Sequence, residues 1–183
     1  MTARRFVVVS GIPGSGKTTL ARALAPALGL PLIDKDDILE RLFETRGIGD
    51  HAWRRSLSRE SDGLLRDAAA ASVAGAVLVS FWRQVGMPAD SGTPTDWLAR
   101  LGADVVHVHC VCPPEIAQTR FSSRKRHDGH LDSFTKHEDV LNQLRVLASL
   151  RPIDVGKQIE VDTSADIEPM SRVAREIVGA WST

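Results

Sequence analysis

The chain has 183 residues, with 23 basic and 23 acidic side chains and hence no formal net charge at pH 7. This length suits one domain with a substantial core, and the balanced charge gives no sign of a nucleic-acid or membrane partner. The N-terminal apolar run is too short for a signal peptide or a membrane span. Cys110 and Cys112 lie too close in one extended run to pair, so we expect reduced thiols in a cytoplasmic protein.

Apolar runs of strand length alternate with amphipathic stretches, which is typical of a parallel sheet with helices on both faces. The expected strands are 6–10, 31–33, 76–81, 105–112 and 158–161. Helices are expected between residues 50 and 74, with Gly75 as the cap, and from Pro113, Thr135 and Ile167. No repeat or linker divides the chain, so we predict one α/β domain over residues 1–183.

Residues 11–18, GIPGSGKT, match the pattern GxxxxGK[ST] between an expected strand and an expected helix. Glycines let successive backbone amides turn toward phosphate oxygens, with the positive helix end behind them. Lys17 is expected to reach the outer phosphates, and the Thr18 hydroxyl to bind Mg²⁺. The expected ligand is therefore ATP. The expected nucleotide-binding residues of this loop are Gly11, Pro13, Gly14, Ser15, Gly16, Lys17, Thr18 and Thr19.

Four features together resemble the small P-loop kinases: the N-terminal P-loop, the acidic DKDD after the second strand, a basic segment after the fourth, and the final VDTS. That group includes shikimate and gluconate kinases, chloramphenicol phosphotransferase and polynucleotide 5'-kinases. The resemblance implies a three-layer P-loop NTPase fold, like that of the AAA-family ATPases, with a five-stranded parallel sheet in the order 2-3-1-4-5. It also implies ATP and Mg²⁺ as cofactors.

Three acids, Asp34, Asp36 and Asp37, follow the second strand, where open α/β sheets place ligands. In the resembled kinases the second acid of this pattern contacts the acceptor hydroxyl. Asp36 is therefore expected to orient that hydroxyl and accept its proton, with Asp34 beside Thr18 at the metal. The alternative is that Asp36 and Asp37 only cap the next helix. Polynucleotide 5'-kinases tend to carry an arginine three residues further on, where this chain has Leu39.

The third strand ends in SFWRQ, without the acid that many P-loop enzymes place near Mg²⁺. The metal would then depend on Thr18, Asp34 and the phosphates. Trp82 and Arg83 would either line an acceptor pocket or be a buried tryptophan and a surface arginine.

A basic segment at about 124–133 lies where the resembled kinases carry a lid. Arginines from a closing lid stabilise the transferred phosphoryl group and exclude water. The expected catalytic cations are Lys17, Arg120, Arg124 and Arg126, with Gly129 as a hinge. The alternative is a solvated charged surface.

Two motifs in the second half of the chain complete the set of candidates. In the resembled kinases the VDTS turn lies beside the adenine, which makes Thr163 an expected nucleotide contact; capping of the last helix is the alternative. HVHCVC, residues 107–112, contains residue types that bind zinc. Because a strand alternates its side chains, the histidines and cysteines would face opposite sides, and we expect core residues there.

The sequence thus predicts a kinase that transfers the γ-phosphoryl group of ATP to a hydroxyl of a small, largely uncharged molecule, with nucleic acid a less favoured partner. Arg54, Arg55, Arg59 and Arg83 are then expected to be solvated helix charges, and the alternative is that they face the cleft and bind an anion. One alternative is a polynucleotide 5'-hydroxyl or toxin-type kinase. Another is an NTP-hydrolysing switch or adaptor, which would be expected to carry the acid that the third strand lacks.

Overall fold

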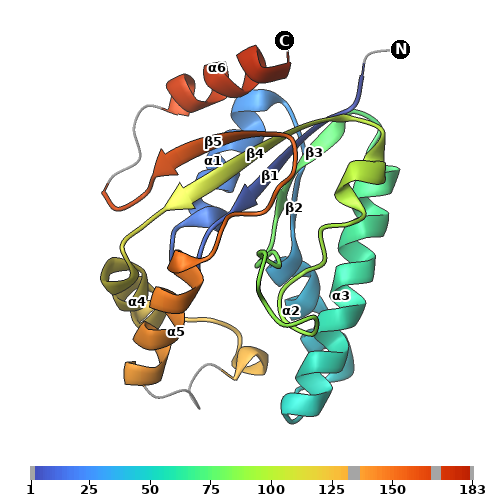
Figure 1. Cartoon of the computed structure of the whole chain (residues 1–183). Helices are drawn as coiled ribbons and strands as arrows, with labels where there is room; N and C mark the ends of the chain where they lie inside the picture. Colours follow the sequence, from blue (N-terminus) through green and yellow to red (C-terminus); the bar gives the residue numbers. More distant parts are fainter. Residues whose placement is uncertain (1–2, 132–136, 166–169, 182–183) are drawn as a thin grey trace.

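The computed structural model describes residues 3–131, 137–165 and 170–181. Its centre is one sheet of five parallel strands in the order β2-β3-β1-β4-β5, as expected (Figure 1). The strands are β1 (Arg5–Ser10), β2 (Leu32–Asp34), β3 (Gly75–Val79), β4 (Asp104–Val111) and β5 (Lys157–Asp162). Each predicted strand end lies within two residues of the observed one.

The apolar runs of the sequence are explained by burial on both faces of the sheet. Phe6–Val9 of β1 and Ala76–Leu78 of β3 are completely buried, since each of these strands has neighbours on both sides. Alternate residues enter different cores. Val7 and Val9 pack under α1 (Lys17–Leu28) and α6 (Met170–Trp181), whereas Phe6 and Val8 pack under α3 (His51–Ala71) and residues 98–101.

The remaining helices form two pairs at the carboxyl ends of the strands. α2 (Lys35–Arg46) packs on α3 through a small apolar cluster, and α4 (Pro114–Ser123) packs on α5 (His137–Ser149). Figure 1 shows the two pairs on opposite sides of the space below the strands. No helix of the three described ranges is long and apolar enough to cross a membrane.

Some predicted helix boundaries need correction or lie outside the described residues. Gly75 does not cap α3, whose cap is Ser72. Instead it opens β3 at φ +105°, where a Cβ atom would lie 1.7 Å from the carbonyl oxygen of Arg5, so only glycine allows β1 this close. The expected helix starts at Thr135 and Ile167 fall outside the described residues.

In the HVHCVC segment His107, Cys110 and Cys112 are buried, as expected, and His109 is half-buried. The Ser10 hydroxyl bonds Nε2 of His107 at 2.6 Å and Nδ1 of His109 at 2.8 Å, and burial lowers the pKa of His107 to about 4. Cys110 and Cys112 are free thiols, both buried. Within the described part of the chain, no three His, Cys, Asp or Glu side chains are grouped to hold a metal ion.

Candidate active site

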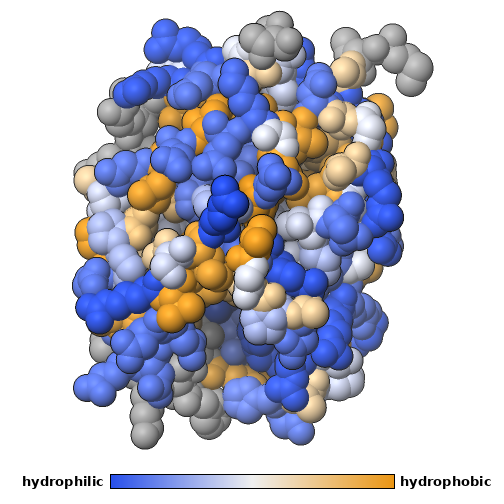
Figure 2. Space-filling view, in the orientation of Figure 1, coloured by the Kyte–Doolittle hydropathy of each residue, from blue (hydrophilic) through white to orange (hydrophobic). Residues whose placement is uncertain are grey.

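A cavity of about 920 Å³ lies at the carboxyl edge of the sheet, between the two helix pairs. Its wall combines the P-loop, the start of α2, one face of α3, the end of β3 and the basic segment after α4. Figure 2 shows this face of the molecule hollowed between α4–α5 and α3, with mostly hydrophilic side chains over α3. The cavity thus joins the candidate nucleotide and acceptor sites in one space.

The P-loop forms one side of the cavity, to which it contributes Pro13, Gly14 and residues 16–19. Gly14 has φ +80°, and a Cβ there would lie 2.1 Å from the Ala117 carbonyl oxygen, so glycine is required. α1 begins directly after the loop, with Gly16 as its N-cap, so the positive end of the helix faces the loop. Gly11 and the fully buried Ser15 lie behind this surface.

Lys17 is the first residue of α1, and its Nζ lies 2.9 Å from the carbonyl oxygen of Ile12 in the loop. Loss of solvation lowers its pKa to about 8 despite the nearby Asp34 and Asp36. A group of negative charges in the cavity would favour the charged form of this lysine. The position therefore suits a polyphosphate.

Thr18 and Asp34 meet at the base of the cavity, where the threonine hydroxyl donates to Asp34 Oδ2 at 3.0 Å. Asp34 Oδ1 accepts the backbone N–H of Asp36 at 3.0 Å, so Asp34, and neither Asp36 nor Asp37, is the N-cap of α2. Burial raises the pKa of Asp34 to about 6. A hydroxyl and a carboxylate beside phosphate oxygens form the oxygen-rich surroundings that Mg²⁺ prefers.

Asp36 faces the cavity next to this pair and forms an ion pair with Arg126, with Oδ2 and Nη2 2.6 Å apart. The Asp36 side chain keeps 48% of its surface exposed, against 16% for Arg126. Burial by itself would raise the pKa of Asp36, but the charges of Arg126, His130 and Lys17 outweigh it and lower the pKa. Asp36 is therefore a carboxylate at neutral pH.

The described part of the basic segment, residues 124–131, docks on α2. His130 Nε2 lies 2.9 Å from Glu40 Oε1, and Phe43 stacks on His127 with ring centroids 5.4 Å apart. Gly129 packs against the same Phe43 ring, where a Cβ would approach within 2.5 Å, so the structure gives this glycine a packing role. Arg124 and Arg126 both line the cavity.

Arg120 and Thr163 connect the VDTS turn to the P-loop. The Arg120 guanidinium donates to the carbonyl oxygens of Thr163 and Ser164, and the Thr163 hydroxyl donates to the Ser15 carbonyl at 2.6 Å. Arg120 also reaches the cavity, whereas Thr163 is 1% exposed and lies behind the loop. Direct contact of Thr163 with a nucleotide stays a prediction.

The face of α3 contributes cavity residues that were not among the expected site residues. Residues at helical spacing along this face line the cavity: His51, Arg54, Arg55, Ser58, Arg59 and Asp62. Of the three arginines, Arg55 and Arg59 are exposed, as expected, but all three line the cavity, which was the alternative considered for them. Eight cationic side chains and four carboxylates line the cavity, so a chain without net charge concentrates positive charge here. The i, i+4 repeat of polar residues was the signal available in the sequence.

Trp82 and Arg83 do not line the cavity. Trp82 is 2% exposed, packs against Trp97, and donates from Nε1 to the Val9 carbonyl at 2.9 Å. Arg83 Nε donates to the Ser91 carbonyl at 3.0 Å. The expectation of a buried tryptophan is therefore correct, and an aromatic wall for the acceptor is absent at Trp82. Arg83 is half-buried and lies outside the described helices, so the expectation of a solvated helix charge was wrong for it.

Comparison with known proteins places this geometry in context. A model of the AAA domain family matches residues 6–150. A candidate kinase from Chloroflexus aurantiacus superposes with a TM-score of 0.85 at 26% identity, covering 98% of this chain and 99% of that one. A cytidylate kinase of Pyrobaculum neutrophilum is 32% identical over 169 residues, which are 90% of this chain and 85% of that protein. A shikimate kinase of Thermobifida fusca is 51% identical over 41 residues, only 22% of this chain and 24% of that protein.

Proposed function

This chain belongs to the AAA-domain family, and from that premise we propose that it is a kinase that transfers the γ-phosphoryl group of ATP to a hydroxyl of a small molecule. The observation that supports this most directly is the single cavity in which the P-loop, Asp36 and the basic segment face one another. A phosphate donor and an acceptor bound there would share one space, which would bring the reacting groups together.

The nucleotide would bind along the P-loop, with its outer phosphates at Lys17 and the positive end of α1. Thr18 and Asp34 fit Mg²⁺ as oxygen donors, directly or through water. When bound, the ion neutralises charge on the phosphate oxygens. Arg124 and Arg126 would stabilise the charge of the phosphoryl group during transfer.

The acceptor would bind between Asp36 and α3. Its hydroxyl oxygen attacks the γ-phosphorus, the bond to the bridging oxygen breaks, and the hydroxyl proton passes to the Asp36 carboxylate. In the present structure Asp36 is paired with Arg126. Movement of Arg126 toward the phosphates would free that carboxylate when the donor is bound.

The acceptor itself would carry an anionic group. Arg55 and Arg59 lie one turn apart on α3, line the cavity, and pair with no carboxylate among the described residues. Arginine binds carboxylate and phosphate groups through paired hydrogen bonds. This revises the largely uncharged acceptor that the sequence suggested.

A phosphate acceptor is the second candidate, because the Pyrobaculum relative is a cytidylate kinase and matches over most of its length. The two functions differ in their need for a base. An alcohol must lose a proton during transfer, whereas a phosphate is already ionised at neutral pH. The presence of Asp36 beside the P-loop favours the alcohol.

Incubation with γ-labelled ATP and four sets of acceptors tests the proposal: neutral polyols, hydroxy acids such as gluconate and shikimate, cytidine monophosphate, and 5'-hydroxyl oligonucleotides. We expect labelling of a hydroxy acid, and loss of labelling in Arg55→Ala/Arg59→Ala. Preferred labelling of cytidine monophosphate would establish the second candidate. Efficient, salt-sensitive labelling of oligonucleotides would instead indicate a polynucleotide kinase, and ATP hydrolysis without any transfer would indicate a switch.

A further inference from the structure

Lys35 is a buried cation in the middle of the acidic DKDD motif, between Asp34 and Asp36. Its side chain is 11% exposed, and Nζ forms an ion pair with Asp62 Oδ1 at 2.6 Å. Nζ also donates to Ser58 Oγ at 3.2 Å and to Thr93 Oγ1 at 3.1 Å. An ammonium group has three N–H donors, so these three acceptors use all of them. Lys35 therefore has no donor left for a substrate, although it borders the cavity.

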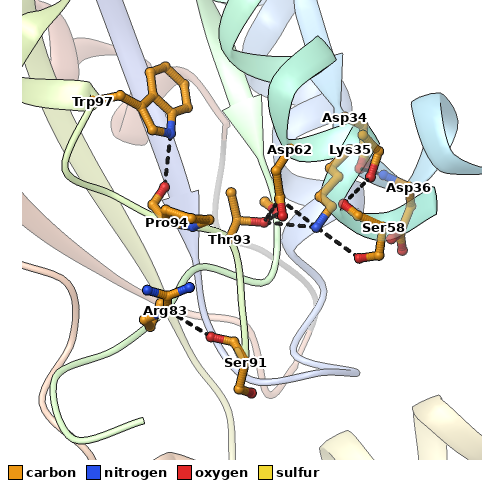
Figure 3. A network of polar contacts seen from close by, with 12 residues as sticks. Asp34, Lys35, Asp36, Ser58, Asp62, Arg83, Ser91, Thr93, Pro94 and Trp97 are labelled. Atoms are coloured by element: carbon orange, nitrogen blue, oxygen red, sulfur yellow. Dashed lines mark hydrogen bonds and ion pairs between the residues drawn. The ribbon is translucent and has the colours of Figure 1, made fainter. Parts of the chain in front are cut away.

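Thr93 anchors this network through both its side chain and its backbone (Figure 3). Its hydroxyl donates to Asp62 Oδ1 at 2.7 Å and bonds Ser80 Oγ at 2.5 Å. Its backbone is hydrogen-bonded at both ends: Thr93 N–H donates to the Phe81 carbonyl, and Arg83 N–H donates to the Thr93 carbonyl, each at 2.8 Å. The Thr93 side chain is completely buried and thereby attached to the chain that extends β3.

Through this network Lys35 connects the two halves of the candidate acceptor site. Asp34 and Asp36 precede and follow it at the start of α2. Ser58 and Asp62 belong to the same face of α3 as Arg55 and Arg59, the cations that we assign to the acceptor. A change at Lys35 would thus alter the rotation and distance of that face relative to the two acids.

We propose that Lys35 is a positioning residue, which holds the cavity face of α3 in register with Asp34 and Asp36 and so determines how an acceptor is oriented for transfer. The kinetic part of this inference rests on the proposed kinase function. The structural part depends only on the contacts of Lys35 with Asp62, Ser58 and Thr93.

A second ion pair between the same two helices provides a matched control. Arg46 at the end of α2 donates twice to Glu60 of α3, with both distances 2.6 Å, and both side chains are more than one-third exposed. Neither residue lines the cavity. If the attachment of α2 to α3 were all that mattered, loss of either pair would affect the kinetics similarly.

The test compares Lys35→Gln with Arg46→Gln in the full chain, using the acceptor that the wild type phosphorylates fastest and a fluorescent ATP analogue. For Lys35→Gln we expect an acceptor KM at least about 10-fold higher and a kcat about 10-fold lower, with the Kd of the ATP analogue within about twofold of wild type. For Arg46→Gln we expect the acceptor KM, the kcat and the Kd of the ATP analogue to stay within about twofold of wild type. Amide hydrogen exchange should become faster in residues 54–62 of Lys35→Gln and stay unchanged in β1.

Thr93→Val serves if Lys35→Gln does not fold, since it removes one acceptor of Lys35 without touching the cavity wall. It should raise the acceptor KM about threefold with unchanged binding of the ATP analogue. Unchanged acceptor KM, or unchanged exchange in residues 54–62, in the folded variants would overturn the positioning role. A wild-type protein that phosphorylates no acceptor would refute the proposed function instead, and the exchange comparison would still decide the role of Lys35.

Discussion

Asp36 and Asp37 are adjacent acids with different surroundings. Asp36 faces the cavity and pairs with Arg126, which lies 90 residues away in the sequence. Asp37 Oδ1 lies 3.7 Å from Arg22 Nη2, and both side chains are more than half exposed. A pair of this kind at the surface contributes little to stability. Substitution of Asp36 therefore tests a role in transfer, whereas substitution of Asp37 tests only the loss of a surface charge.

Asp36→Asn is expected to lower kcat by about 10²- to 10⁴-fold, because an amide cannot accept the hydroxyl proton. The Kd for ATP should change little, since Asp36 is assigned to the acceptor. Asp37→Asn is the control and should leave kcat within about twofold of wild type. Steady-state kinetics with a separate nucleotide-binding assay measures both effects, and equal losses in the two variants would contradict the assignment.

The ionisation of Asp34 should make the free energy of unfolding depend on pH. Its folded pKa of about 6 lies above the ordinary 3.8, so the folded state binds this proton more tightly than the unfolded state. The contribution of Asp34 to the free energy of unfolding is therefore most favourable below about pH 4, and it is lost as the pH rises through about 6. Asp34→Asn keeps a good N-cap residue and does not ionise. It should therefore exceed the wild type in free energy of unfolding by about 1–3 kcal/mol at pH 8.

Urea denaturation at several pH values measures this difference, with the nucleotide-free protein in each case. The advantage of Asp34→Asn should be small near pH 4, grow toward pH 6, and stay constant above about pH 7. A difference that does not vary with pH would show that the ionised carboxylate is not destabilising in the folded protein.

At the level of the elements, the sequence was informative wherever a local pattern determines the structure. The P-loop match and the apolar runs identified β1 and α1, because these depend on glycine conformation and on burial of both sheet faces. The strand order was expected from the resemblance to small P-loop kinases, and the sheet has that order. The cavity face of α3 was not selected as part of the site, since its polar residues look the same on a helix that faces solvent. Only the position of α3 against α2 brings those arginines to Asp36.

The basic segment after α4 is the element with the clearest expected effect on transfer. Arg124→Ala/Arg126→Ala should reduce kcat by about 10²-fold or more, because these charges matter most when the phosphoryl group moves. ATP binding should weaken much less. Lys125→Ala is the control, since Lys125 lies between the two arginines but does not line the cavity. If Lys125→Ala lowered kcat as much as the double variant, general surface charge would be the cause.

At the scale of the whole molecule, nucleotide binding should raise the stability of the folded state. A ligand present at 100 times its Kd stabilises the folded state by about 2.7 kcal/mol, so MgATP should raise the Tm of the wild type by several degrees. Lys17→Ala removes the cation at the outer phosphates and keeps the backbone loop. It should unfold near the wild-type Tm without nucleotide and gain little from MgATP in a thermal-shift assay. An unchanged gain would contradict the role of Lys17.

The strand order also has a consequence for synthesis on the ribosome. β1 leads directly into the P-loop, but Phe6 of β1 pairs with Ala76 and Val105, which are translated much later. Pairings between distant segments form slowly, because a long loop must close first. A nascent chain that ends before β3 would contain the complete GIPGSGKT motif and still lack the sheet that holds the loop. Nucleotide affinity should therefore arise only after β3 and β4 have emerged and docked on either side of β1.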